Sequence, residues 1–103
     1  EGILRLQDGY SPEVGRIEVY HSDNWATICD DEWDNDDATV ACREFGYKKG
    51  WSRDGGHFSA GTGAIAMDEI NCVGTESSLV SCPFDGWMNH DCDATEHAGV
   101  LCG

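Results

Sequence analysis

Hydrophobic and polar residues alternate along residues 16–21, the period of a β-strand with one buried face. One face would carry Ile17, Val19 and His21, and the other Arg16, Glu18 and Tyr20. Ser22, Asp23 and Asn24 then supply turn residues, and a second β-rich run leads up to Cys29. The pattern predicts a β-hairpin.

A helical period replaces the alternation after Asp34. Asp34, with Asp37 three residues later, is typical of a helix cap, and Gly46 is placed to end the helix. The apolar residues between them recur at three- and four-residue intervals: Ala38, Ala41, Cys42 and Phe45. The sequence therefore predicts one main helix.

The remaining elements are short. Residues 63–72 are expected to contain a third strand, residues 75–82 one helical turn capped by Thr75, and residues 99–102 a terminal strand. Glycine and serine residues between Lys48 and Gly63 predict a long loop. The fold class is therefore α+β, with a small curved sheet holding one main helix. The 103 residues are expected to form a single domain over 1–103.

Six cysteines are many for this length, and their even number suggests disulfides. Structural zinc sites use close pairs such as C-x2-C, whereas the tightest spacing here is ten, so disulfides are the favoured interpretation. Disulfides persist outside the cytosol, which predicts an extracellular location. No stretch of the sequence resembles a signal peptide, and none reaches the length of an apolar membrane span. We therefore expect a piece of a longer secreted or membrane-anchored protein, without direct membrane insertion.

The charge is strongly negative. Twenty acidic residues against six basic ones give a formal net charge of −14. Nucleic acids and anionic membranes require a basic surface, so neither is expected as a partner. Such a surface favours cations, either metal ions or basic partners.

Six of the carboxylates lie in the twelve positions between Cys29 and Cys42. An EF-hand loop starting at Asp30 would need glycine at its sixth position and glutamate at its twelfth, and the chain has Asn35 and Ala41 there. A solvated acidic surface is the alternative to a metal site. However, Asp30 and Asp31 directly follow a cysteine that a disulfide would fix, and they resemble half of an oxygen-ligand site for a hard cation.

Catalysis has little support in the sequence. The chain contains neither a G-x-S-x-G nor an H-E-x-x-H motif, and paired cysteines would leave no nucleophilic thiol. His90 and His97 lie near acidic residues, but structural or surface roles are favoured for both. We therefore predict that the domain is not an enzyme.

Four longer stretches point to a family: "GRIEVYH", "WATICDDEWDNDDATVACREFGY", "GTGAIAMDEINCVGTESSLVSC" and "HDC…EHAGVLC". In this order they resemble a scavenger receptor cysteine-rich (SRCR) domain over essentially the whole chain. The chain is similar to group A, which has six cysteines, because Glu13 and Tyr47 stand where group B has two more. "TICDDEW", "DATV", "GYKKG" and "GTESSL" are similar to the domain that ends the collagenous macrophage receptors of the family.

The resemblance implies a curved antiparallel sheet cradling one helix, and the disulfides Cys29–Cys92, Cys42–Cys102 and Cys72–Cys82. It also implies a Ca²⁺ site, with Mg²⁺ as an alternative ion, formed by Asp30, Asp31 and Glu96. A second cation site would use Asp68 and Asp91, with Glu69 as a helper.

The chain departs from the family pattern at several positions. The family usually has a second acidic residue directly after the position of Glu96, and this chain has His97 there. A histidine at this position would make the site sensitive to pH. Some members bind polyanions through arginine clusters, and this chain has few arginines. A bound cation would instead bridge to an anionic ligand.

These observations predict a non-catalytic extracellular module that recognises a protein or an anionic ligand through a bound cation. One alternative is an accessory docking domain of a secreted protease or amine oxidase. Another is a structural spacer in a tandem array, whose acidic surface binds nothing specific.

Overall fold

The structure is a computed structural model that describes residues 2–9, 11–53, 64–89, 92 and 97–103. Within these residues the chain forms six strands, one α-helix and one 3-10 turn. In chain order they are β1 (Leu4–Gln7), β2 (Val14–His21), β3 (Asn24–Ile28), α1 (Asn35–Glu44), β4 (Gly50–Arg53), β5 (Ile65–Met67), the 3-10 turn η1 (Leu79–Ser81) and β6 (Gly99–Cys102). No helix among the described residues is long and apolar enough to cross a membrane.

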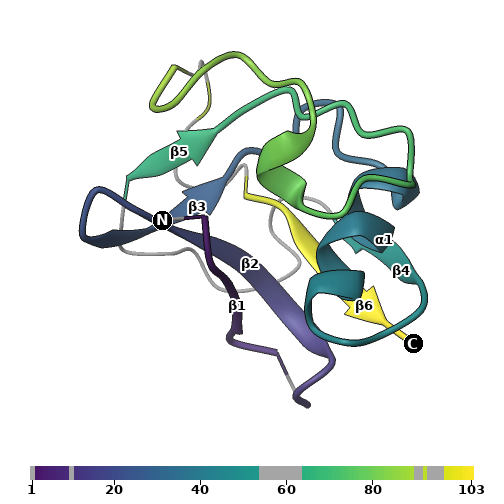
Figure 1. Cartoon of the computed structure of the whole chain (residues 1–103). Helices are drawn as coiled ribbons and strands as arrows, with labels where there is room; N and C mark the ends of the chain where they lie inside the picture. The colour runs from purple at the N-terminus through teal and green to yellow at the C-terminus, as the bar shows by residue number, and fades with distance from the viewer. Residues whose placement is uncertain (1, 10, 54–63, 90–91, 93–96) are drawn as a thin grey trace.

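The strands form one curled sheet in the order β4-β6-β2-β3-β5, and β1 pairs with β2 as well. Figure 1 shows α1 lying beside β4 and β6 at one end of the sheet. The α+β class is confirmed. The expectation of an entirely antiparallel sheet is wrong, because β3 and β5 pair in parallel. The chain between these strands passes through α1 and β4, and this long crossover allows β5 to return in the same direction as β3.

The predicted hairpin is confirmed. His21 pairs with Asn24, so the turn consists of Ser22 and Asp23, with φ of 51° and 67°. Positive φ at both central residues gives a tight turn whose twist matches that of the strands, and serine and aspartate tolerate this conformation.

The predicted helix is also confirmed, together with its capping residues. The carboxylate of Asp34 accepts a hydrogen bond from the backbone N–H of Asp37, and the Asp37 carboxylate accepts one from the Asp34 N–H. This reciprocal pair satisfies two amide donors that the first helical turn leaves unpaired. At the other end, Gly46 adopts a φ of 94°, which few other residues accept.

Three elements differ from the sequence-based expectations. The helical turn near residue 79 has Ser78 rather than Thr75 at its N-cap position, and Ser78 makes no side-chain capping bond. The expected loop after Lys48 contains β4, which pairs with β6. Gly50 permits this packing, because a Cβ atom there would lie 2.5 Å from the Ala38 carbonyl oxygen. Strand β1 was not predicted, although Leu4 and Leu6 alternate with polar residues.

The core lies between the sheet and α1. Ile17, Ile28, Val40 and Val100 are fully buried there. Trp33 is also buried, and its indole N–H donates a 2.9 Å hydrogen bond to the carbonyl oxygen of Gly99. The acidic stretch between Cys29 and Cys42 is thereby attached to β6 at Trp33.

All six cysteines are paired. The bridges are Cys29–Cys92, Cys42–Cys102 and Cys72–Cys82, the pairing that the family resemblance implies. The first two close loops with sequence separations of 63 and 60 residues. Long loops lose the most chain entropy on cross-linking, so these two bridges are expected to stabilise the fold most.

Candidate cation site

Two carboxylates converge on the Cys29–Cys92 bridge. Oδ2 of Asp31 lies 3.5 Å from the Cys92 sulfur, and Oδ1 of Asp68 lies 3.8 Å from the same atom. One carboxylate oxygen from each residue lies within 4.8 Å of the other. The sulfurs belong to a disulfide and are not ligands, so the pair offers oxygen atoms alone. Oxygen donors suit a hard divalent cation such as Ca²⁺ or Mg²⁺.

Local structure explains how Asp31 reaches this position. The backbone of Cys29 pairs with that of His97 in a short antiparallel β-bridge, so the end of β3 is attached to the segment before β6. The chain then turns, as the backbone N–H of Trp33 donates to the Asp30 carbonyl oxygen at 3.0 Å. Glu32 has a φ of 63° within this turn. The result is an Asp31 side chain held beside the disulfide.

Asp68 comes from the other side of the site. It directly follows β5, and only 1% of its surface is exposed. Its carbonyl oxygen accepts a hydrogen bond from the backbone N–H of Asp85, which brings that loop close. Carboxylate oxygens of Asp68, Glu69 and Asp85 form a second group within 4.8 Å of one another. A cavity of about 370 Å³ beside it is lined by Glu32, Glu69 and Asp85 on its acidic side and by Phe84 on its apolar side.

The structure therefore brings together only part of each expected ligand set. Asp31, Asp68 and Glu69 lie in the two groups, whereas Asp30 lies in neither group found among the described residues. Glu96 and Asp91 lie outside the described residues. Asp85 was missed, because nothing in its local sequence indicates that its loop packs against the end of β5.

His97 is buried, with 2% of its surface exposed. Burial lowers the pKa of its imidazole, as does the charge of Arg16, while Asp30 and Asp8 act in the opposite direction. Its Nδ1 atom is buried without a hydrogen-bond partner among the described residues. The lowered pKa favours the neutral form of the imidazole.

A third cluster of potential ligand atoms consists of the Glu76 carboxylate and the two sulfurs of the Cys72–Cys82 disulfide. Here the carboxylate already accepts hydrogen bonds from the backbone N–H groups of Val73 and Gly74, at 2.9 and 3.0 Å. The bond from Val73 is the main cause that lowers the pKa of Glu76. This group acts as a loop cap rather than as a cation site.

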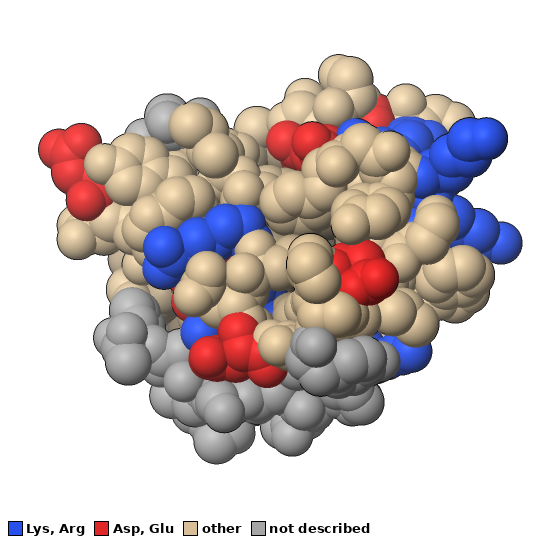
Figure 2. Space-filling model, turned by 90° about the horizontal axis from the view of Figure 1, so that it is seen from below, with Lys and Arg blue, Asp and Glu red and all other residues tan. Residues whose placement is uncertain are grey.

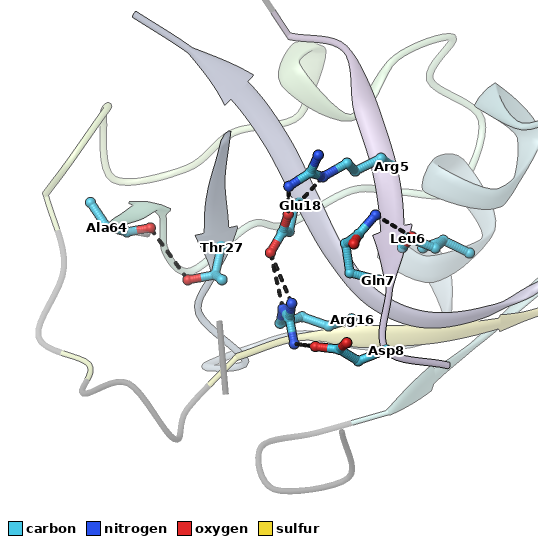
Figure 3. A network of polar contacts seen from close by, with 8 residues as sticks. All are labelled: Arg5, Leu6, Gln7, Asp8, Arg16, Glu18, Thr27 and Ala64. Atoms are coloured by element: carbon cyan, nitrogen blue, oxygen red, sulfur yellow. Dashed lines mark hydrogen bonds and ion pairs between the residues drawn. The ribbon is translucent and has the colours of Figure 1, made fainter. Parts of the chain in front are cut away.

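Two arginines on the outer face of the sheet are paired within the domain. Figure 3 shows Glu18 between Arg5 and Arg16, with contacts of 2.7 and 3.1 Å, and Arg16 continuing to Asp8 at 2.6 Å. Arg16 and Glu18 are each only 5% exposed. Figure 2 shows basic side chains mainly along one side of the face in view, with acidic side chains directly beside some of them. Arg5 and Arg16 thus do not form an open cluster for a polyanion.

Comparisons with known proteins agree with this architecture. The family model of the scavenger receptor cysteine-rich domain matches residues 7–103. The SRCR domain of mouse MARCO, solved in a dimeric form, is 49% identical, with a TM-score of 0.83 over 87% of this chain and 86% of that chain. The third SRCR domain of murine neurotrypsin is 41% identical, with a TM-score of 0.89 over 97% of this chain and 94% of that chain. Domains of this family are typically disulfide-rich, extracellular, ligand-binding and non-catalytic. The chain belongs to the scavenger receptor cysteine-rich domain family.

Proposed function

We propose that this domain is an extracellular, non-catalytic module that binds its ligand through a divalent cation. The observation that carries the proposal is the approach of the Asp31 and Asp68 carboxylates beside the Cys29–Cys92 bridge. Two like charges held this close repel each other unless a counter-charge lies between or beside them. A bound Ca²⁺ would supply that charge.

The proposed first site consists of Asp30, Asp31 and Glu96, and the second of Asp68 and Asp91 with Glu69. The two proposed sites would adjoin where Asp31 approaches Asp68. Three carboxylates do not complete the six to eight oxygen ligands that Ca²⁺ takes. Water, backbone carbonyl groups and an anionic group of the ligand would fill the remaining positions. A carboxylate, sulfate or phosphate of an extracellular partner would then bind to the ion, without a cluster of free arginines.

Calcium titration tests the proposal. Extracellular calcium modules bind at about 10⁻⁴ to 10⁻³ M. At a concentration tenfold above such a Kd, binding stabilises the fold by RT ln 11, or about 1.4 kcal/mol, which raises the Tm of a domain this size by about 5 to 10 °C.

We expect Asp31→Asn to remove most of that rise while the calcium-free variant stays folded. The matched control is Asp23→Asn in the exposed hairpin turn, which removes the same charge elsewhere. If millimolar calcium gives neither heat nor a thermal shift, the acidic stretch is only a solvated surface.

A second candidate is an accessory domain in a larger secreted protein. The 41% identical structure is the third SRCR domain of neurotrypsin, so that protein carries such domains in series. In this role the domain would space or dock its neighbours and contribute no chemistry. A full-length protein whose ligand binding is unchanged by calcium and by Asp31→Asn would favour this candidate.

A further inference from the structure

Glu44 is an acidic residue at the unfavourable end of α1. It is the last residue of the helix, where the aligned peptide dipoles are negative and basic side chains are preferred. Its Oε2 atom accepts a 2.8 Å hydrogen bond from the backbone N–H of Leu79. Burial raises the pKa of this carboxyl, and the Leu79 bond opposes the effect. None of the ion pairs among the described residues involves Glu44. Glu44 is exposed at the surface, and its carboxylate has no cationic partner among these ion pairs.

A cavity of about 360 Å³ lies next to Glu44, between β1 and the end of α1. Its apolar walls are formed by Ile3, Leu4, Phe45 and Val80. Ile3 is 62% exposed, whereas Leu4 is buried. None of the described residues that line the cavity is a lysine or arginine. A side chain with an apolar stem and a cationic head would complement both its walls and its charge.

Strand β1 presents an open edge beside this cavity. It pairs with β2 alone among the described strands (Figure 1). Tyr20 donates its backbone N–H to the Ile3 carbonyl oxygen, and hydrogen-bonded positions alternate along an antiparallel pair. The backbone groups of Leu4 and Leu6 therefore point away from β2. The Leu6 carbonyl oxygen accepts a hydrogen bond from the Gln7 side chain. The Leu6 N–H, the Leu4 N–H and the Leu4 carbonyl oxygen make no backbone hydrogen bond within the described chain. An additional extended strand would find free donors and acceptors here.

We propose that this β1–Glu44 groove docks an extended basic segment of a partner protein. An arginine or lysine of the segment contacts Glu44, and its main chain pairs along β1. The net charge of −14 favours basic partners over acidic ones and raises their rate of encounter. The groove shares no residue with the proposed cation sites, and the segment binds without calcium.

A short synthetic peptide tests the groove directly. The probe is an acetylated and amidated pentapeptide of alternating threonine and valine with a central arginine. The matched peptide contains citrulline, which keeps the shape and removes the charge. Amide NMR spectra of the ¹⁵N-labelled domain in EGTA report where each peptide binds. We expect the arginine peptide to shift the resonances of Leu4, Leu6, Phe45 and Val80. The citrulline peptide should bind about tenfold more weakly, because its neutral N–H groups make a weaker hydrogen bond to the Glu44 carboxylate than the charged guanidinium does.

Two pairs of variants separate docking in the groove from diffuse attraction. Glu44→Gln keeps an oxygen acceptor for the Leu79 N–H and should weaken the peptide about tenfold, whereas Asp23→Asn makes the same charge change at an exposed turn and should have less than a twofold effect. Ile3→Lys should block the groove, whereas Val73→Lys, at a position that is 73% exposed and outside it, should not.

Equal weakening by Glu44→Gln and Asp23→Asn would overturn the proposal, as would shifts confined to Glu69 and Asp85. Because these titrations contain EGTA, a domain that fails to bind calcium can still bind the peptide. The failure of one proposal is therefore distinguishable from the failure of the other.

Discussion

Asp37 links the start of the helix to a disulfide loop, because its Oδ1 atom accepts a 2.8 Å hydrogen bond from the backbone N–H of Cys72. The other oxygen accepts from the Asp34 N–H, and the side chain is fully buried. Burial raises the pKa of this carboxyl from 3.8 to about 7, although both amide bonds favour the charged form. One side chain thus joins the capping box to the loop closed by Cys72–Cys82.

The raised pKa of Asp37 predicts a dependence of stability on pH. Between about pH 4 and 7 the folded state holds a proton on Asp37 that the unfolded state has lost, so the free energy of unfolding falls as the pH rises through this window. Asp37→Asn cannot titrate and should lose less stability between pH 5 and 7.5 than the parent protein, by an amount on the order of a few kcal/mol. Urea unfolding in EGTA at both pH values measures the difference. Identical pH slopes for the two proteins would contradict the prediction.

Trp33→Phe is expected to destabilise the domain by about 1 to 3 kcal/mol. Phenylalanine keeps most of the apolar contact but leaves the carbonyl oxygen of Gly99 without the indole donor in a buried position. Trp51→Phe is the control, because Trp51 is 38% exposed and its indole N–H makes no hydrogen bond among the described residues. Chemical denaturation should distinguish the two variants, and a Trp33 effect as small as that of Trp51 would argue against a structural role for this bond.

The disulfides should differ in their contribution to stability. Removing Cys42–Cys102 by paired alanine substitutions releases a loop with a sequence separation of 60 residues, and removing Cys72–Cys82 releases one of 10. The chain-entropy model gives about 4 kcal/mol for the first and about 3 kcal/mol for the second. Thermal unfolding of the two double variants checks the order. A reversed order would indicate that packing around the cysteines outweighs loop entropy.

Asp31 and Asp68 should be energetically coupled in calcium binding. Their carboxylate oxygens lie within 4.8 Å of each other. Removing the charge of one side chain therefore changes how strongly the other attracts a bound calcium ion, and neighbouring residues of this kind give non-additive effects. We expect the double variant, Asp31→Asn with Asp68→Asn, to lose clearly less calcium-induced stabilisation than the two single losses added together. Differential scanning calorimetry of all four proteins, with calcium and with EGTA, completes the cycle. Strict additivity would contradict the prediction, because it would mean that the two proposed sites bind calcium without influencing each other.

Local signals in the sequence were sufficient for the hairpin and the helix. Alternation at residues 16–21 and the Asp34–Asp37 cap are determined by neighbouring residues, and both predictions were confirmed. The parallel pairing of β5 was not predictable in this way. Ile65–Met67 is only three residues long, and its partner and direction depend on how the whole intervening segment packs.

The candidate site was only partly predictable for a similar reason. Asp31 and Asp68 could be chosen as ligands, by adjacency to a cysteine and by family resemblance, but their approach to each other depends on the Cys29–Cys92 bridge. Asp85 is brought to Asp68 by a backbone hydrogen bond between two loops. No periodicity or motif indicates such a contact, so only a three-dimensional structure reveals it.

The packing of α1 against β4 has a consequence for how the domain behaves beside its neighbours. Asn35 accepts a hydrogen bond from the backbone N–H of Ser52, and the Thr39 hydroxyl bonds to both the N–H and the carbonyl oxygen of Gly50. These are the groups that β4 would otherwise offer to a strand from another molecule. Helical side chains thus occupy the outer margin of the sheet at β4. Copies of the domain brought close together are thereby hindered from pairing edge to edge through this strand.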